Sequence, residues 1–267
     1  MPLPKCCYRV AATDEVELRL KLLRSGMAGL VPESEIPLTS LGELLLGGMF
    51  GVDHKVDVDR LIYDRRPQNA QERRLGWARL PVGAQLGRIV LDRGEVLRAS
   101  GDDIRTYFFR LKNIEGTEHR NCVGRQIDGS EVTEFGGIPG VKYRMGLRIV
   151  GMGDLNAVDV AHCTHQDLLI HFGCMDPTKV VELGRVMPDG NVYELLYIDD
   201  HIVVHRGPRC SVGEGTGPDR DLIEASHRAY EAAGLPRAPE KGLWLWTFAG
   251  RWQGVRSHYL RCPGDPG

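Results

Sequence analysis

The sequence has no apolar run long enough to cross a membrane and no excess of charge of either sign. Its longest apolar stretch, Leu41–Val52, is short and rich in glycine, and the first ten residues (MPLPKCCYRV) contain no apolar signal core. The secretory and membrane classes are therefore excluded. The 34 Lys and Arg residues balance 36 Asp and Glu residues to a net charge of −2, so any nucleic-acid partner must be held by a local basic patch.

The cysteine count does not fit a disulfide framework. There are seven cysteines, an odd number, and Cys6 and Cys7 are adjacent, which indicates free thiols in a reducing compartment. We expect an intracellular protein, either cytoplasmic or nuclear. With 267 residues, of which 42% are hydrophobic, the chain can bury the core of one large domain or of two small ones.

Hydrophobic periodicity and turn residues predict several elements. In the first half of the chain they are a helix over residues 15–27, a short helix before Gly47, and an irregular glycine-rich insertion over residues 113–144 with a short hairpin. In the second half they are a β-hairpin over residues 192–204 with Asp199 and Asp200 at its turn, a helix over residues 219–233 with Asp219 as N-cap, and a strand-like aromatic tail over residues 242–259.

One segment differs in charge from the rest of the chain. Residues 60–110 contain eleven Arg, no Lys and six acids, a net charge of +5, so the remaining residues carry −7. Arginine matches phosphate oxygens with two parallel hydrogen bonds, so this segment is of the kind that a phosphate-lined ligand selects. A solvated charged surface is the alternative when the segment is taken alone.

Two pairs of aspartates suggest a metal site. Asp199 and Asp200 lie between two apolar runs, and Asp102 and Asp103 follow an upstream segment that contains Val96 and Leu97. Buried unpaired carboxylates are costly, so such residues either face water or hold a cation. A hard divalent ion such as Mg²⁺ prefers several oxygen ligands, which two separate strand ends can supply together.

Four motifs in order resemble those of the reverse transcriptases. Residues 60–69 (RLIYDRRPQN) are similar to the signature of the fingers, and residues 102–109 (DDIRTYFF) to the first palm motif. Residues 150–158 (VGMGDLNAV) are similar to the second palm motif, and YIDD at 197–200 to the catalytic hairpin. Each motif alone is weak, but their common order is specific. The resemblance covers roughly residues 48–254.

The resemblance implies a role for each matching residue. Asp103, Asp199 and Asp200 would be catalytic and hold Mg²⁺ or Mn²⁺, with Asp102 as the alternative first ligand. The aromatic five positions after the acid, Phe108 or in the other register Tyr107, would reject a ribose 2′-hydroxyl. The remaining expected residues are Arg60, Lys55, Gly153, Asn156 and Tyr197 for nucleotide binding, Arg66 and Asn69 for template phosphate or as scaffold beside Asp64, and Lys241 after the last palm helix.

The implied fold is α+β, a right-hand polymerase with an antiparallel palm sheet backed by helices. The expected domains are an N-terminal helical extension (1–40), fingers (41–95), palm (96–112), fingers insertion (113–147), palm (148–234), and the end of the palm with the thumb absent or truncated (235–267). The implied function is template-directed synthesis of DNA, with a retroelement origin, deoxynucleoside triphosphates and a primed RNA or DNA template.

Two other functions remain open for this sequence. The second palm motif has Gly151 and Val158 where the family has proline, so a truncated, non-catalytic relic that at most binds nucleic acid is the main alternative, and a metal-dependent nuclease is a more distant one.

Two further motifs do not indicate a binding site. The spacing of Cys163 and His165 does not match a zinc site and favours a core cysteine with partly exposed histidines. Residues 213–217 lack the lysine of a phosphate-binding loop.

Overall fold

The computed structural model describes residues 3–55, 58–213, 216–238 and 246–248. The chain forms two compact units, each built from two stretches. The first unit contains residues Met1–Trp77 and Thr106–Ala161, and the second contains Ala78–Arg105 and His162–Gly267. The domain names given above stay a prediction. None of the helices in the described part of the chain is long and apolar enough to span a membrane.

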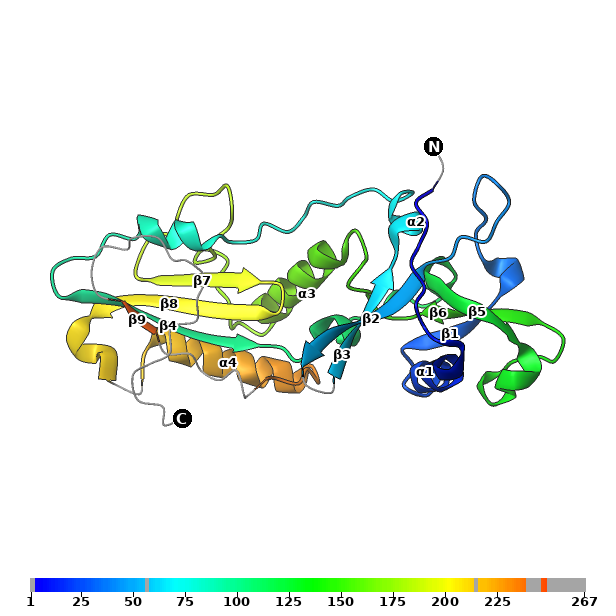
Figure 1. The fold of residues 1–267 in the computed structure, drawn as a ribbon. Helices are drawn as coiled ribbons and strands as arrows, with labels where there is room; N and C mark the ends of the chain where they lie inside the picture. The colour runs from blue at the N-terminus through cyan, green and yellow to red at the C-terminus, as the bar shows by residue number, and fades with distance from the viewer. Residues whose placement is uncertain (1–2, 56–57, 214–215, 239–245, 249–267) are drawn as a thin grey trace. The chain divides into compact units, whose positions relative to one another are not determined.

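The first unit packs one helix against a three-stranded antiparallel sheet of order β1-β6-β5, beside a two-stranded ribbon, β2-β3 (Figure 1). Its elements are α1 Ala12–Arg24, β1 Ala28–Pro32, β2 Gly48–Lys55, β3 Val58–Asp64, α2 Arg66–Asn69, β5 Cys122–Asp128 and β6 Lys142–Leu147. The predicted first helix is confirmed as α1, which starts three residues earlier. Acids in its first turn and bases in its last turn complement the helix dipole.

The core of this unit forms where α1 meets the sheet. Leu22 and Leu23 of α1 are buried together with Met49, Val123 and Met145 from the strands. The side chains of a strand alternate between its two faces, so the apolar residues of β5 and β6 reach this core while the polar ones stay outside.

One sequence prediction in this unit holds in part, and another is wrong. The short hairpin expected within residues 113–144 is confirmed as β5 and β6, which pair antiparallel, but β6 also pairs with β1, so the segment is not an irregular insertion. The glycines that suggested irregularity occupy turns, as Gly136 and Gly140 do with positive φ. The short helix expected before Gly47 is absent: Leu38 and Leu44 form an antiparallel bridge there, closed by the Thr39 amide donating to the Glu43 carbonyl at 2.7 Å.

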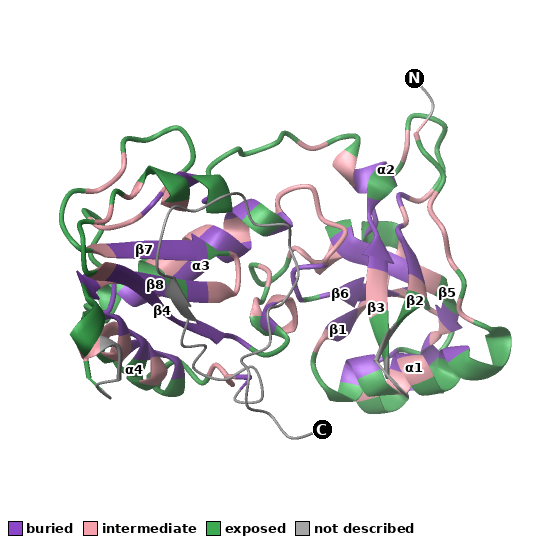
Figure 2. Cartoon of the chain, turned by 60° about the vertical axis from the view of Figure 1, so that its left-hand side comes forward, coloured by how far each residue is buried: buried purple, intermediate pink, exposed green. Residues whose placement is uncertain are grey.

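The second unit is a four-stranded antiparallel sheet of order β7-β8-β4-β9, with α4 packed against it. Its strands and helix are β4 Glu95–Asp103, β7 Val192–Tyr197, β8 Asp200–Pro208, α4 Pro218–Ala232 and β9 Trp246–Phe248. A further helix, α3 Ala157–His171, spans the boundary between the two units. In Figure 2 the strands β4, β7 and β8 are largely buried, whereas α4 alternates between buried and exposed residues.

The predicted hairpin and last helix are confirmed with shifted details. β7 and β8 pair directly, but Ile198 and Asp199 form the turn, and Asp200 is already the first residue of β8. Helix α4 begins at Pro218 with Gly217 as N-cap. Asp219 does not cap it, because its carboxylate is buried against Arg98. Of the aromatic tail, residues 246–248 form a strand, and the rest lies outside the described residues.

Candidate active site

The register of the sheet brings two of the predicted carboxylates together. β4 pairs with β8 so that Asp103 lies opposite Asp200, and β7 pairs with β8 so that Tyr197 lies opposite Asp200. Residues directly opposite in an antiparallel pair have Cα atoms about 4.5–5.5 Å apart and share a face of the sheet. Asp103, Asp200 and Tyr197 therefore lie on one face, and Tyr197 is 47% exposed.

The turn that carries Asp199 is tight and held from two sides. Ile198 has φ of 61°, a left-handed conformation that is costly for a β-branched residue and persists only where surrounding contacts enforce it. On one side, the Ile104 amide donates to the Asp199 carbonyl at 3.2 Å. On the other, His165 Nδ1 lies 2.8 Å from the Ile198 carbonyl. These contacts fix the backbone on which Asp199 stands.

The protonation of His165 follows from its surroundings. Burial lowers the pKa of His165 to about 3, so the imidazole is neutral at pH 7. A carbonyl only accepts hydrogen bonds, so Nδ1 carries the proton and donates the hydrogen bond to the Ile198 carbonyl. Nε2 is then the acceptor for the Tyr230 hydroxyl at 2.8 Å. The sequence predicts partly exposed histidines here, but His162 and His165 are 3% and 0% exposed, so this prediction is wrong for both.

Asp102 and Asp103 point to opposite faces of β4. The Asp102 side chain lies on the face covered by α4, where Arg237 Nε donates to Oδ2 at 2.5 Å and His227 Nε2 lies 3.0 Å away. Burial would raise the pKa of Asp102, but the contacts with His227 and Arg237 outweigh it and the pKa is lowered. Of the two alternatives left open by the sequence, only Asp103 shares the face of Asp200.

The carboxylates have the chemistry of a site for a hard divalent cation. In the described part of the chain, no group of three or more His, Cys, Asp or Glu side chains is arranged to hold a metal ion. Mg²⁺, however, is commonly held by one or two carboxylates, with water and substrate phosphates completing its shell. Asp103 and Asp200, which pair across two strands, are two such carboxylates, and Asp199 precedes Asp200 in the chain.

The predicted residues of the fingers lie in the first unit. Arg60 is an exposed residue of β3 opposite Val52, and Lys55 belongs to β2, with a side chain outside the described set. Arg66 pairs with Asp64 at 2.6 Å. The hydrogen bond from Arg66 lowers the pKa of Asp64 to about 2. Asp64 also accepts from the Cys7 amide at 2.6 Å, which gives it the scaffold role expected from the sequence.

The residues predicted for the second palm motif make hydrogen bonds and packing contacts within the first unit. Asn69 donates to the Gly153 carbonyl at 2.8 Å and accepts from the Leu155 amide at 3.1 Å. Asn156 bridges another segment, since it accepts from the Leu75 amide and donates to the Arg73 carbonyl, both at 2.9 Å. A Cβ on Gly153 would lie 1.8 Å from the Tyr63 carbonyl oxygen, so glycine is required for packing there.

The two aromatic candidates differ in exposure. Tyr107 is 2% exposed, and its hydroxyl donates to the Ala161 carbonyl at 3.0 Å. Phe108 is half-buried. Phe108 also belongs to the same register as Asp103, the acid that lies on the face of Asp200. Lys241 lies outside the described residues.

Two buried polar clusters of the second unit were not predicted from the sequence. Arg98 pairs with Asp219 at 2.5 Å, and Ser100 donates to the same carboxylate at 2.7 Å. The polar residues of β4 were the available signal, although nothing in the sequence indicated their partner in α4. Glu194, His201 and Ser226 form a chain with contacts of 3.2 and 3.1 Å that is similar to a hydrolase triad, yet all three are 0% exposed and no substrate reaches them.

Comparisons with known proteins support the fold. No family model matches the sequence, and no curated protein matches it. The chain is similar in structure to a foamy viral protease-reverse transcriptase, dRH, solved in complex with double-stranded DNA. The TM-score is 0.53 and the sequence identity 15%, and the match covers 90% of this chain and 33% of that one. The chain thus has a mixed α/β fold with antiparallel sheets similar to that of a reverse transcriptase and spans about a third of the viral protein's length.

Proposed function

We propose that the chain is a reverse-transcriptase-like polymerase core, of retroelement origin, that synthesises DNA on a primed RNA or DNA template. The observation that carries the proposal is the register of β4, β8 and β7, which puts Asp103 and Asp200 on one face at the turn that carries Asp199. In this proposal the second unit is the palm, and β2 and β3 belong to the fingers. The bound DNA of the viral structure supports a nucleic-acid ligand.

The proposed chemistry uses the chain's own residues in separate roles. Asp103, Asp199 and Asp200 would hold Mg²⁺ or Mn²⁺, which when bound stabilises charge on the attacking 3′-oxygen and on the departing pyrophosphate. Phe108 would contact the sugar of the deoxynucleoside triphosphate. The exposed Arg60 would pair with the triphosphate oxygens through its guanidinium.

The alternative is a non-catalytic relic that binds nucleic acid without copying it. One observation favours it: Gly153, Asn156 and Asn69 are engaged in packing and hydrogen bonds within the first unit. These residues therefore have a structural reason to be present whether or not a substrate binds.

Primer extension with the purified chain distinguishes these functions. With a primed RNA or DNA template, deoxynucleoside triphosphates and Mg²⁺ or Mn²⁺, we expect the wild-type chain to extend the primer. Asp199→Ala and Asp103→Asn should each abolish this extension. Asp221→Asn, which neutralises an exposed aspartate of α4, is the control and should extend normally. Template binding without extension under either metal would favour the relic, and cleavage of the strand would favour a nuclease. Normal extension by Asp199→Ala would refute the site.

A further inference from the structure

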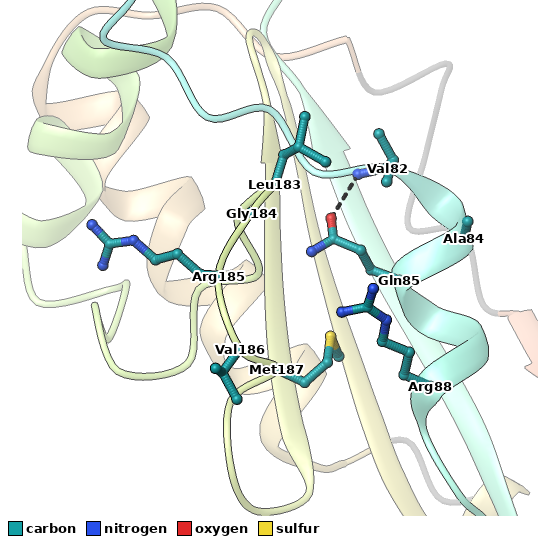
Figure 3. A pocket seen from close by; sticks show the side chains of 9 residues that line it. All are labelled: Val82, Ala84, Gln85, Arg88, Leu183, Gly184, Arg185, Val186 and Met187. Atoms are coloured by element: carbon teal, nitrogen blue, oxygen red, sulfur yellow. Dashed lines mark hydrogen bonds between the residues drawn. The ribbon is translucent and has the colours of Figure 1, made fainter.

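A hollow in the second unit is unrelated to the carboxylate site. It has a volume of about 710 Å³ and is lined by Val82, Ala84, Gln85, Arg88, Leu183, Gly184, Arg185, Val186 and Met187 (Figure 3). Met187 packs against the sheet near Leu97, six residues before Asp103 in β4 and so about 20 Å away along the strand. None of the predicted active-site residues lines it.

The walls of this hollow expose an unusual amount of apolar surface. Val186 is 91% exposed, Leu183 55% and Val82 41%, and all three surround one opening. Apolar side chains gathered around a hollow mark a binding site more often than isolated exposed ones do. The volume is in the range of small-molecule pockets, about 300–1,000 Å³.

Two cations line the hollow, Arg88 and Arg185, and they differ in whether they form an ion pair with another described residue. Gln85 is 5% exposed and braces the two walls, since its Oε1 accepts from the Val82 amide and its Nε2 donates to the Glu182 carbonyl, both at 2.9 Å. Arg185 pairs with Glu182 at 2.6 Å. Arg88 has no ion pair with any described residue, and in Figure 3 its guanidinium lies between the walls, near Met187. No acidic residue lines the hollow.

We propose that this hollow binds a small amphipathic anion, an apolar body that carries one carboxylate. The apolar part would contact Leu183, Val186 and Met187, and the carboxylate would accept hydrogen bonds from Arg88. Because Arg88 is exposed, solvent screens this contact, and its loss should change the affinity about threefold.

Calorimetric titration with decanoate tests the site. We expect decanoate to bind, and Arg88→Gln to weaken its binding about threefold. Arg93→Gln, which changes another exposed arginine of the same segment, should leave the binding unchanged. Val186→Asp should weaken it as well. Equal binding of decanoate and decanol, or equal binding by wild type and Arg88→Gln, would overturn the proposal. A dimer in solution that Val186→Asp dissociates would assign the surface to a second copy of the chain instead.

A second inference concerns Asp102 and rests on the proposed function. Asp102 Oδ1 accepts from the Asp103 amide at 3.0 Å, while Oδ2 contacts Arg237 and His227. The segment that contains Arg237 pairs with the end of β4, since the Ala238 amide donates to the Asp103 carbonyl at 3.0 Å. The Arg105 amide also donates to the Pro236 carbonyl, at 2.8 Å.

These contacts make Asp102 a clamp at the base of the proposed metal ligand. One carboxylate joins α4, the segment after α4 and the backbone of Asp103, and its side chain is 2% exposed. We infer that Asp102 is a positioning residue that orients Asp103 through the backbone and does not itself bind the cation. Its placement on the face opposite Asp200 explains why two consecutive aspartates occur here.

Binding of Mn²⁺, followed by electron paramagnetic resonance without substrate, tests the clamp. We expect Asp103→Asn to abolish binding at the site, and Asp102→Asn and Arg237→Lys each to weaken it about tenfold, a change of about 1.4 kcal/mol. Ser100→Ala is the matched control, because it breaks a buried carboxylate contact on the same face of the same strand and should leave Mn²⁺ affinity unchanged.

The outcomes separate the two hypotheses. If wild type and Asp103→Asn bind Mn²⁺ equally, the metal site of the proposed function fails and the clamp fails with it. If wild type binds Mn²⁺ and both Asp102→Asn and Arg237→Lys bind it as tightly, only the clamp fails. If Ser100→Ala weakens binding as much as they do, the effect is general loosening of the sheet and the positioning role is overturned.

Discussion

Removing the carboxylate of Asp219 should destabilise the second unit more than any surface substitution. Asp219 is 0% exposed and Arg98 is 4% exposed, and their closest atoms lie 2.5 Å apart. The guanidinium also donates to the carbonyls of Ser211 and Thr216, at 3.2 and 2.9 Å. In Asp219→Ala those two carbonyls remain, but the buried guanidinium loses the carboxylate that lies 2.5 Å from it.

The expected magnitude follows from the burial of both partners. Loss of one partner of a buried ion pair costs about 3–5 kcal/mol, and the Ser100 hydroxyl loses its acceptor at a further cost of about 1 kcal/mol. An apolar replacement of the whole group, Arg98→Met with Ser100→Ala and Asp219→Leu, leaves no unpaired charge and should cost far less than Asp219→Ala. By contrast Glu17→Ala, which breaks the exposed pair with Lys21, should cost about 0.5 kcal/mol or less.

Urea unfolding followed by circular dichroism, with amide hydrogen exchange of β4 and α4, measures these changes. Exchange in the two elements should accelerate in Asp219→Ala and return toward wild type in the triple variant. If Asp219→Ala is no less stable than Glu17→Ala, or if the triple variant is as unstable as Asp219→Ala, the ion pair does not hold the sheet to the helix and the reasoning is refuted.

Two further predictions concern His165 and Gly153. Because the folded-state pKa of His165 is lowered to about 3, its contribution to stability is complete above the unfolded value of about 6.5 and is lost as the pH falls, by about 2 kcal/mol between pH 6.5 and 5. Urea unfolding across this range should show a weaker acid dependence for His165→Asn, and an unchanged slope would contradict the assignment. Gly153→Ala should cost about 3 kcal/mol or prevent folding, because the new Cβ meets the Tyr63 carbonyl. Gly87→Ala has open space and should change the free energy of unfolding little, so equal thermal stability of the two variants would count against the packing argument.

The sequence predicts the hairpin and the helices α1 and α4 because their signals are local. Apolar runs on either side of Tyr197–Asp200 determine a hairpin, whatever surrounds it. The signal for β4 is weaker, because Arg98 and Ser100 look unfavourable for a buried strand. Their partner, Asp219, is 121 residues from Arg98, and no local pattern encodes such a contact.

The same limit applies to the candidate site. Spacing identifies Asp102 and Asp103 as a pair, but only the pairing of β4 with β8 decides which of them lies beside Asp200. The prediction of an irregular segment over residues 113–144 fails for a related reason, apart from its hairpin. The glycines form turns, and the pairing of β6 with β1 joins residues more than a hundred positions apart.

The division of each unit between two stretches of chain has a consequence for synthesis. β1 can pair with β6 only after residue 147 has been synthesised. β4 can pair with β8 only after the residues from Asp200 onward have been synthesised. Neither unit can therefore complete its sheet while the ribosome is still adding the first half of the chain, and no single cut yields either unit as a continuous fragment. Late closure of both sheets leaves their strand edges exposed to chaperones and to other nascent chains, so expression of the chain should depend strongly on the rate of translation and on temperature.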